Sequence, residues 1–154
     1  MSGGDAAGDA AGDAAGGPAS VRPAGWPRPV GYADGVVAAG RVLAISGQIG
    51  WDPTTQRFAS DDFAEQAARA LANVVAVLRA AGGEPRHLVR LTWYVTDRDA
   101  YVAARPAIGR AYRATIGDHW PAMAVLVVAG LLEPRALVEV EATAVLPPLP
   151  PLPG

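Results

Sequence analysis

The sequence predicts an α+β fold in which two helices pack on one face of a mixed sheet. The chain has 154 residues, of which 51% are hydrophobic and 18% charged, so it can bury the core of one domain. Apolar residues recur at helical spacing after residue 62, and short runs rich in β-branched and aromatic residues lie on both sides of that segment. The expected element order is β-β-α-β-α-β-β. A single helical layer leaves the other sheet face uncovered, and a partner subunit is the usual cover.

The domain is expected to span residues 21–146, between two tails. The motif Gly-Asp-Ala-Ala occurs three times between Gly4 and Ala15, without an apolar face to bury. Residues 1–20 are therefore expected to be disordered. Residues 147–154 are rich in proline and favour an extended polyproline II conformation. We interpret them as a loose tail; a PxxP ligand for a partner protein is the alternative.

The domain is expected to open with a β-hairpin. Residues 36–39 and the apolar run at 42–45 flank Gly40-Arg41, which suits a tight turn. The second strand of this hairpin continues into the sequence SGQI and is expected to be mostly buried.

A helix is expected to follow over residues 63–81. Asp62 and Glu65 have the spacing of a capping box, and apolar residues then recur every three or four positions. Gly82-Gly83 ends the pattern, as glycine does just after many helices.

The sequence of the second half of the domain predicts three more strands and a second helix. Residues 88–95 are rich in β-branched and aromatic residues, so they predict a strand. The second helix is expected to begin in earnest at Pro106, with Arg105 as its N-cap, because proline suits the first helical position. Residues 122–129 are almost wholly apolar, as in a strand covered on both faces. Residues 137–145 alternate in polarity and predict a half-buried strand.

The composition excludes several classes of chemistry. The chain has no Cys, and all 13 of its basic residues are Arg. Disulfides, thiolate nucleophiles, Cys-ligated zinc, Schiff-base chemistry and a phosphate-binding lysine are therefore excluded. With two His, a His-rich metal centre is not expected. The net charge of −2 and the lack of a spanning segment predict a cytoplasmic protein that binds neither nucleic acid nor membrane.

An ordered set of short motifs carries the evidence for function. The set comprises SGQI at Ser46–Ile49, Gln66 with Asn73, WYVTD at residues 93–97, Pro121-Ala122, and VEVEA at residues 138–142. In this order and spacing they resemble the RidA family, also called YjgF or endoribonuclease L-PSP, over residues 31–146. The resemblance implies a chorismate-mutase-like fold and a homotrimer with ligand clefts between subunits.

The resemblance also implies a reaction, the hydrolysis of small enamines and imines to keto acids and ammonia without metal or cofactor. Tyr32 matches the family tyrosine that lines the cleft, and Ser46 matches the serine of the SGQ motif. Glu139 matches the glutamate that holds the attacking water.

The chain departs from the family where the substrate carboxylate is bound. Met123 stands in the place of the family's Arg, and methionine cannot form a forked hydrogen bond or carry charge. Val125 replaces a common cysteine, and Arg105 replaces an asparagine that contacts substrate. Arg105 is therefore a candidate for the missing anchor, unless it points to solvent.

Other residues keep two interpretations. Glu139 either positions water or belongs with Glu141 to a solvated layer on an edge strand. Tyr32 and Ser46 either contact ligand or only pack and bond to nearby backbone. Gln66 and Asn73 are expected to fix backbone, and His119 is either a proton-transfer group or structural; we favour the structural role.

Three functions follow in order of preference. The first is imine hydrolysis, with Glu139 as the catalytic residue and a small molecule as substrate, for which a carboxylate is one candidate. The second is a trimeric ligand-binding protein that has kept the cleft without the chemistry. The third is ribonuclease activity, which the older family name suggests but which no basic stripe or stacking platform supports.

Overall fold

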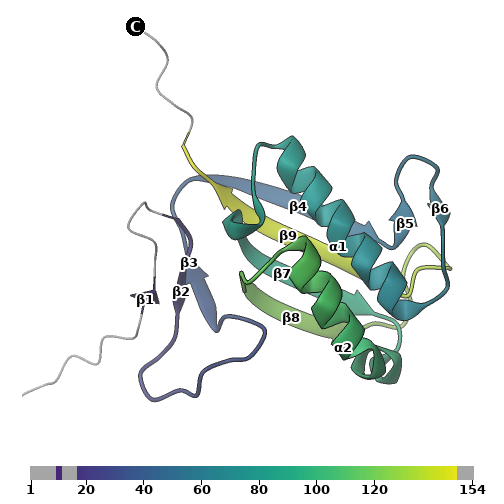
Figure 1. Ribbon diagram of the computed structural model, residues 1–154, viewed down its shortest axis with the longest axis horizontal. Helices are drawn as coiled ribbons and strands as arrows, with labels where there is room; N and C mark the ends of the chain where they lie inside the picture. The colour runs from purple at the N-terminus through teal and green to yellow at the C-terminus, as the bar shows by residue number, and fades with distance from the viewer. Residues whose placement is uncertain (1–9, 12–16, 149–154) are drawn as a thin grey trace, which may run out of the picture.

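The core of the molecule is a four-stranded mixed sheet with two helices on one face. The computed structural model describes residues 10–11 and 17–148, and Figure 1 shows both helices lying side by side in front of the sheet. The sheet has the order β4-β9-β7-β8, in which β7 and β8 are parallel and the other neighbours antiparallel. Its strands and helices are β4 (Arg41–Ile49), α1 (Phe63–Ala80), β7 (Leu88–Val95), α2 (Arg98–Thr115), β8 (Ala122–Val127) and β9 (Val138–Leu146). The predicted α+β class is confirmed.

Smaller elements surround this core. A second sheet near the N-terminus has the order β1-β2-β3, and β5 pairs with β6 in a short hairpin after β4. A 3-10 turn, η1, precedes β7. The bounds are β1 (Ala10–Ala11), β2 (Ala19–Val21), β3 (Gly35–Val37), β5 (Trp51–Asp52), β6 (Arg57–Phe58) and η1 (Pro85–His87). Within the expected N-terminal tail, Ala10 and Ala11 thus belong to β1, and Ala19 and Ser20 belong to β2. Most of both expected tails lies outside the described residues.

The predicted hairpin between residues 36–39 and 42–45 is wrong. β3 pairs with β2, and β4 pairs with β9 from Arg41 to Ile49, apart from a register shift between Ile45 and Gln48. Gly40 has a φ of 148°, and a side chain there would overlap the Leu146 carbonyl of β9. The glycine therefore lets the chain pass close to β9 instead of folding back on itself.

Helix α1 begins and ends where the sequence predicts. The Asp62 side chain accepts a hydrogen bond from the Glu65 N–H at 2.9 Å. The return bond of a capping box is replaced, because the Asp62 N–H donates to the Ser60 hydroxyl. Gly82, with a φ of 79°, follows the last turn. The face towards the sheet is fully buried at Ala67, Ala70, Leu71, Val74 and Leu78.

Helix α2 begins well before the predicted start at Pro106, since Arg98 is its first residue. Asp97 is the N-cap and accepts hydrogen bonds from two backbone N–H groups of the first turn, at 2.8 and 2.9 Å. Pro106 lies inside the helix on its exposed side, and Arg105 is exposed in the helix middle instead of at an N-cap. The aspartate cap outweighs the positional preference of proline.

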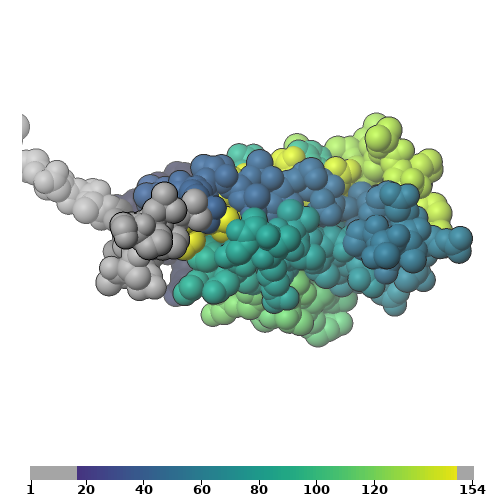
Figure 2. All heavy atoms as spheres, turned by 90° about the horizontal axis from the view of Figure 1, so that it is seen from above, coloured from purple at the N-terminus to yellow at the C-terminus, as the bar shows by residue number. Residues whose placement is uncertain are grey.

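Strands β8 and β9 differ in their burial. Residues of β9 alternate between buried and half-buried, as predicted, and β9 has neighbours on both sides, so Glu139 does not lie on an edge strand. β8 is an edge strand, and the exposed fractions of Val125, Leu126 and Val127 are 43%, 44% and 58%. The single chain therefore does not provide the expected cover on both faces of β8. Figure 2 shows the helices, teal and green, on one side of the sheet, with the yellow-green segment after β8 projecting from one end.

Candidate functional site

The strongest candidate for a catalytic group, Glu139, lies against the SGQ motif. The register between β4 and β9 shifts between Ile45 and Gln48, so Ser46 and Gly47 form a bulge opposite the glutamate strand. A Cβ built on Gly47 would overlap the Glu139 carboxylate. The missing side chain of Gly47 thus provides the space that the carboxylate fills.

Glu139 opens into a pocket of about 510 Å³ at the end of β4. Gln48 and Trp51 contribute polar and aromatic groups, and Leu132 comes from the loop after β8. The exposed fraction of Leu132 is 99%, so its side chain is almost wholly uncovered within the single chain. This pocket holds a carboxylate beside backbone and amide groups, as the positioning of a water molecule requires.

Ser46 lies next to this pocket without lining it. Its hydroxyl accepts a 3.3 Å hydrogen bond from the Gln48 side chain, whose Nε2 also donates to the Ser46 carbonyl at 3.2 Å. Ser46 therefore shapes the bulge and holds Gln48, which does line the pocket.

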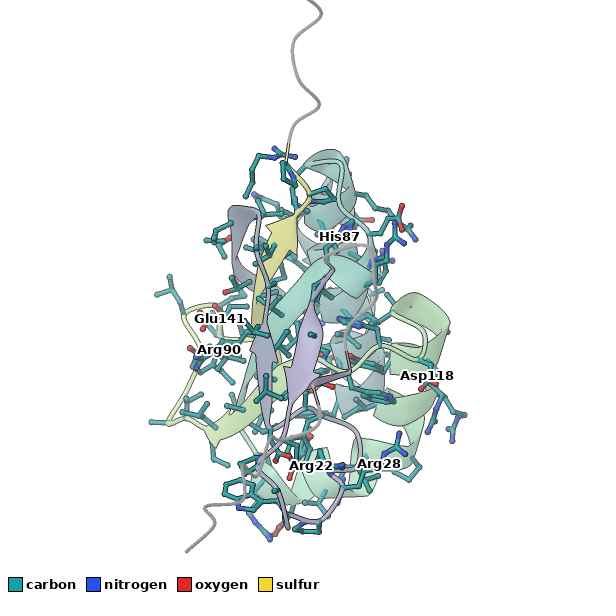
Figure 3. The ribbon with its side chains drawn as sticks, turned by 90° about the vertical axis from the view of Figure 1, so that its left-hand side faces the viewer. Arg22, Arg28, His87, Arg90, Asp118 and Glu141 are labelled. Carbon is teal, nitrogen blue, oxygen red and sulfur yellow. The ribbon has the colours of Figure 1, made fainter. Side chains whose placement is uncertain are left out.

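The sheet face opposite the helices carries polar groups beyond those of the sequence motifs. Tyr94 is paired in register with Glu139, and the interaction of its hydroxyl with the Glu141 carboxylate raises the pKa of the phenol. Arg90 lies on the same face of β7, and Figure 3 shows Arg90 and Glu141 on the side away from the helices. Period-two alternation in β7 would have placed Tyr94 beside Glu139, had the pairing of β7 with β9 been known.

Gln66 and Asn73 fix backbone, as predicted. The Gln66 amide donates to the Ser60 and Arg135 carbonyls, both at 3.1 Å, and accepts from the Leu137 N–H at 2.9 Å. Asn73 donates to two carbonyls around the start of β5, at 2.9 and 3.0 Å. These amides therefore hold β5 and the segment before β9, which both flank the Glu139 pocket.

Met123 belongs to the core side of β8. It is paired in register with the buried Leu91 of β7 and packs against the hydrophobic core. Val125, two residues later, lies on the same face and is exposed near the open end of the strand. Neither residue supplies charge or a hydrogen-bond donor from its side chain.

The single chain does not bring the predicted site residues together. Tyr32 lines a pocket of about 610 Å³ near the N-terminal sheet. Arg105 lines a third depression on the outer side of α2, together with Val102 and Arg113. Glu139 lines neither, so Tyr32 and Arg105 have no access to its carboxylate within one subunit.

Both the ring and the backbone carbonyl of His119 make hydrogen bonds within the protein, which supports a structural role. Its Nε2 lies 2.7 Å from the Leu88 carbonyl, and since a carbonyl can only accept, this nitrogen donates. The carbonyl of His119 accepts the Tyr112 hydroxyl at 2.7 Å. Burial raises the pKa of that phenol, so it stays protonated and the bond persists.

Among residues 10–11 and 17–148, no cluster of three or more His, Cys, Asp or Glu side chains is placed to hold a metal ion. In the same part of the chain, no helix has the length and apolar character needed to cross a membrane.

Comparison with known proteins gives the family. The family model described as endoribonuclease L-PSP matches residues 27–146. This match covers most of the chain. The chain belongs to the endoribonuclease L-PSP family, the same RidA/YjgF family that its motifs resemble.

Several relatives of this RidA-family chain have similar length. The human 2-iminobutanoate/2-iminopropanoate deaminase is 32% identical over 123 residues, which cover 80% of this chain and 86% of the human protein. Protein DfrA of Myxococcus xanthus is 36% identical over 122 residues, covering 77% of this chain and 88% of DfrA.

Solved structures of the family share the fold. The Rid-family protein YyfB of Yersinia pestis superposes with a TM-score of 0.75 at 31% identity, covering 84% of this chain and 99% of YyfB. The YjgF gene product of E. coli has a TM-score of 0.59 at 32% identity, covering 74% of this chain and 87% of YjgF. The E. coli protein TdcF, solved with bound serine, has a TM-score of 0.61 at 28% identity, covering 77% of this chain and 91% of TdcF.

Proposed function

We propose that this RidA-family chain hydrolyses a small imine or enamine, with Glu139 as the catalytic residue. The observation that carries the proposal is the Glu139 carboxylate seated over Gly47, at the mouth of a pocket lined by Gln48. Family relatives named 2-iminobutanoate/2-iminopropanoate deaminase support the reaction class.

In the proposed reaction, Glu139 accepts a proton from water as the water oxygen attacks the imine carbon. The carboxyl passes this proton to the nitrogen, which gives a carbinolamine. The carbinolamine hydroxyl then gives its proton to the Glu139 carboxylate, which passes it to the nitrogen as the carbon–nitrogen bond breaks, so that ammonia leaves and a carbonyl product remains. A positioned carboxylate suits this task because it accepts a proton and returns it without a cofactor.

We further propose a homotrimer whose subunits complete the cleft. Tyr32 and Glu139 line different pockets of one chain, so a shared site needs them to come from different subunits. The exposed apolar residues of β8 and the almost fully exposed Leu132 support such an assembly, because large exposed apolar groups mark interfaces.

The test compares Glu139→Gln with Glu141→Gln. Imines generated in situ from amino acids serve as substrates, and release of ammonia and keto acid is measured. Loss of a general base predicts a fall in turnover of about 10²–10⁴-fold for Glu139→Gln, with much less change for Glu141→Gln. An equal loss in both variants would point to a structural role for this carboxylate layer.

The second candidate function is ligand binding without catalysis. Met123 favours it, because this residue packs into the core and leaves its strand without the family's carboxylate-binding cation. If the parent protein hydrolyses none of the imines tested but still binds a ligand, this alternative is established.

A further inference from the structure

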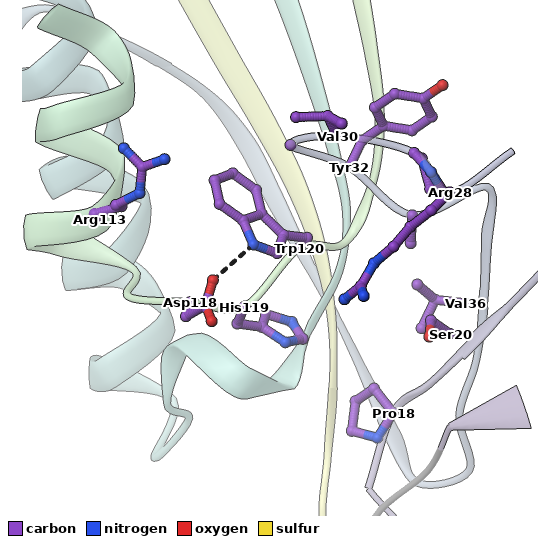
Figure 4. A pocket seen from close by; sticks show the side chains of 13 residues that line it. Pro18, Ser20, Arg28, Val30, Tyr32, Val36, Arg113, Asp118, His119 and Trp120 are labelled. Carbon is purple, nitrogen blue, oxygen red and sulfur yellow. Dashed lines mark hydrogen bonds between the residues drawn. The ribbon is translucent and has the colours of Figure 1, made fainter. Parts of the chain in front are cut away.

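A pocket larger than that of Glu139 lies apart from it. This pocket has a volume of about 610 Å³ and forms where the segment between β2 and β3 meets the loop between α2 and β8 (Figure 4). Small-molecule sites typically have volumes of about 300–1,000 Å³. The size therefore suits a ligand with one or two rings.

Arg28 places a positively charged guanidinium in this pocket. Within the described part of the chain, its guanidinium makes no hydrogen bond or ion pair. In Figure 4 the guanidinium reaches into the pocket towards His119, although the side chain begins on the opposite wall. A guanidinium presents a planar fork of N–H donors that matches a carboxylate.

Trp120 provides a fixed aromatic surface. Its ring stacks on Tyr112, with centroids 4.6 Å apart and planes inclined by 4°. Its Nε1 donates to the Asp118 carboxylate at 2.9 Å, so the ring is held at its edge as well. The side chain is only half-buried and lines the pocket, which leaves aromatic surface for a ligand without a further cost in side-chain entropy.

The charges around the pocket favour one negative charge. Arg28 and Arg113 each contribute a positive charge, and Asp118 contributes a negative one, so these three groups leave an excess of one positive charge. Among the described residues, the Arg113 side chain makes one long hydrogen bond, 3.5 Å to the Gly109 carbonyl, which leaves most of its N–H donors available. A monoanion is matched better than a dianion, which Asp118 would repel.

We propose that this pocket binds a small aromatic monocarboxylate, with its carboxylate on Arg28 and its ring against Trp120. Arg113 adds long-range attraction from the far side of the tryptophan. Within one subunit this pocket is separate from that of Glu139, which does not line it, and the Tyr32 hydroxyl points away from it in Figure 4.

The test measures binding of phenylacetate and its neutral counterpart phenylacetamide by titration calorimetry and by the indole N–H signals in NMR. The Trp120 signal is assigned from its disappearance in Trp120→Phe. Phenylacetate should bind and shift this signal, and phenylacetamide should bind at least about tenfold more weakly. Loss of a charged hydrogen bond predicts at least about a tenfold weaker affinity in Arg28→Ala.

Matched variants distinguish binding in this pocket from binding elsewhere on the chain. Arg79→Ala removes an exposed charge from α1, away from the pocket, and should keep the affinity of the parent. Equal binding of the two ligands, or an equal loss in Arg79→Ala, would overturn the proposal. Tighter binding of phenyl phosphate than of phenylacetate would overturn its assignment to a carboxylate. Imine hydrolysis should persist in Arg28→Ala, so failure of one proposal leaves the other intact.

Discussion

At the scale of single residues, Gly47 decides where the Glu139 carboxylate lies. A methyl group at Gly47 would overlap that carboxylate, whose flexible end would then move aside. Because a displacement of about 1 Å can reduce a rate 10²-fold, we expect Gly47→Ala to lower imine turnover by about 10- to 100-fold while the fold is kept.

Gly130→Ala is the matched control for this prediction. A Cβ at Gly130 meets nothing within 4 Å, so the substitution should leave turnover unchanged. Turnover in Gly47→Ala equal to that of the parent would show that the position of Glu139 over the bulge is not required for catalysis.

The sequence predicted some residue roles better than others. Gln66 and Asn73 were recognisable as backbone-fixing amides, since both lie on the buried face of one helix. Tyr94 was not recognisable as a neighbour of Glu139, because that contact depends on the pairing of β7 with β9, which are distant in sequence. The roles of Tyr32, Ser46 and Arg105 towards a ligand stay predictions.

At the scale of elements, the bounds of α1 were predictable from the sequence. The Asp62 cap, the helical spacing of the apolar residues and the glycine after the last turn all indicate the same helix. For α2 the positional preference of proline indicated a start at Pro106, whereas the Asp97 side chain caps a helix that begins at Arg98. Similarly, the predicted hairpin rested on a plausible turn at Gly40, whereas the structure uses that glycine for a close approach to β9. Local signals cannot show which distant strand will compete for pairing.

The interior proline of α2 predicts a stabilising substitution. Pro106 cannot donate a hydrogen bond to the carbonyl four residues earlier, and its side chain is exposed. Pro106→Ala should therefore raise the free energy of unfolding by about 1–3 kcal/mol, measured by urea denaturation. A lower stability in this variant would mean that the proline is required for the shape of α2.

The turn η1 predicts a dependence of stability on pH. His87 is buried, and its Nδ1 accepts the Glu84 N–H at 3.0 Å, so the folded state favours the neutral ring. Burial lowers the pKa of His87 below its usual 6.5. The unfolded chain then takes up the proton first as the pH falls, and stability present above pH 6.5 is lost on acidification.

The measurement compares urea unfolding at about pH 7.5 and about pH 5.5 in the parent and in His87→Asn. The Asn oxygen can accept the same N–H but does not titrate. We expect a smaller loss of stability on acidification in His87→Asn, and equal losses in both proteins would assign the effect to other groups.

At the scale of the whole molecule, the fold class was predictable from the sequence, but the distribution of the candidate residues over separate pockets was not. The distribution of Tyr32 and Glu139 over separate pockets cannot be read from a linear pattern, because it depends on how the N-terminal segment and the sheet lie in space. A shared cleft would unite these residues only through the proposed assembly.

The proposed trimer gives the last prediction. Light scattering should give about three times the chain mass of 15.8 kDa. Leu126 lies on the open sheet face with an exposed fraction of 44%, so Leu126→Glu would place a charge in the proposed interface and should shift the mass towards that of one chain. Val77→Glu alters a similarly exposed valine, at 38%, on the helical layer and should stay trimeric. A monomeric parent protein, or equal dissociation of both variants, would contradict assembly through the sheet face.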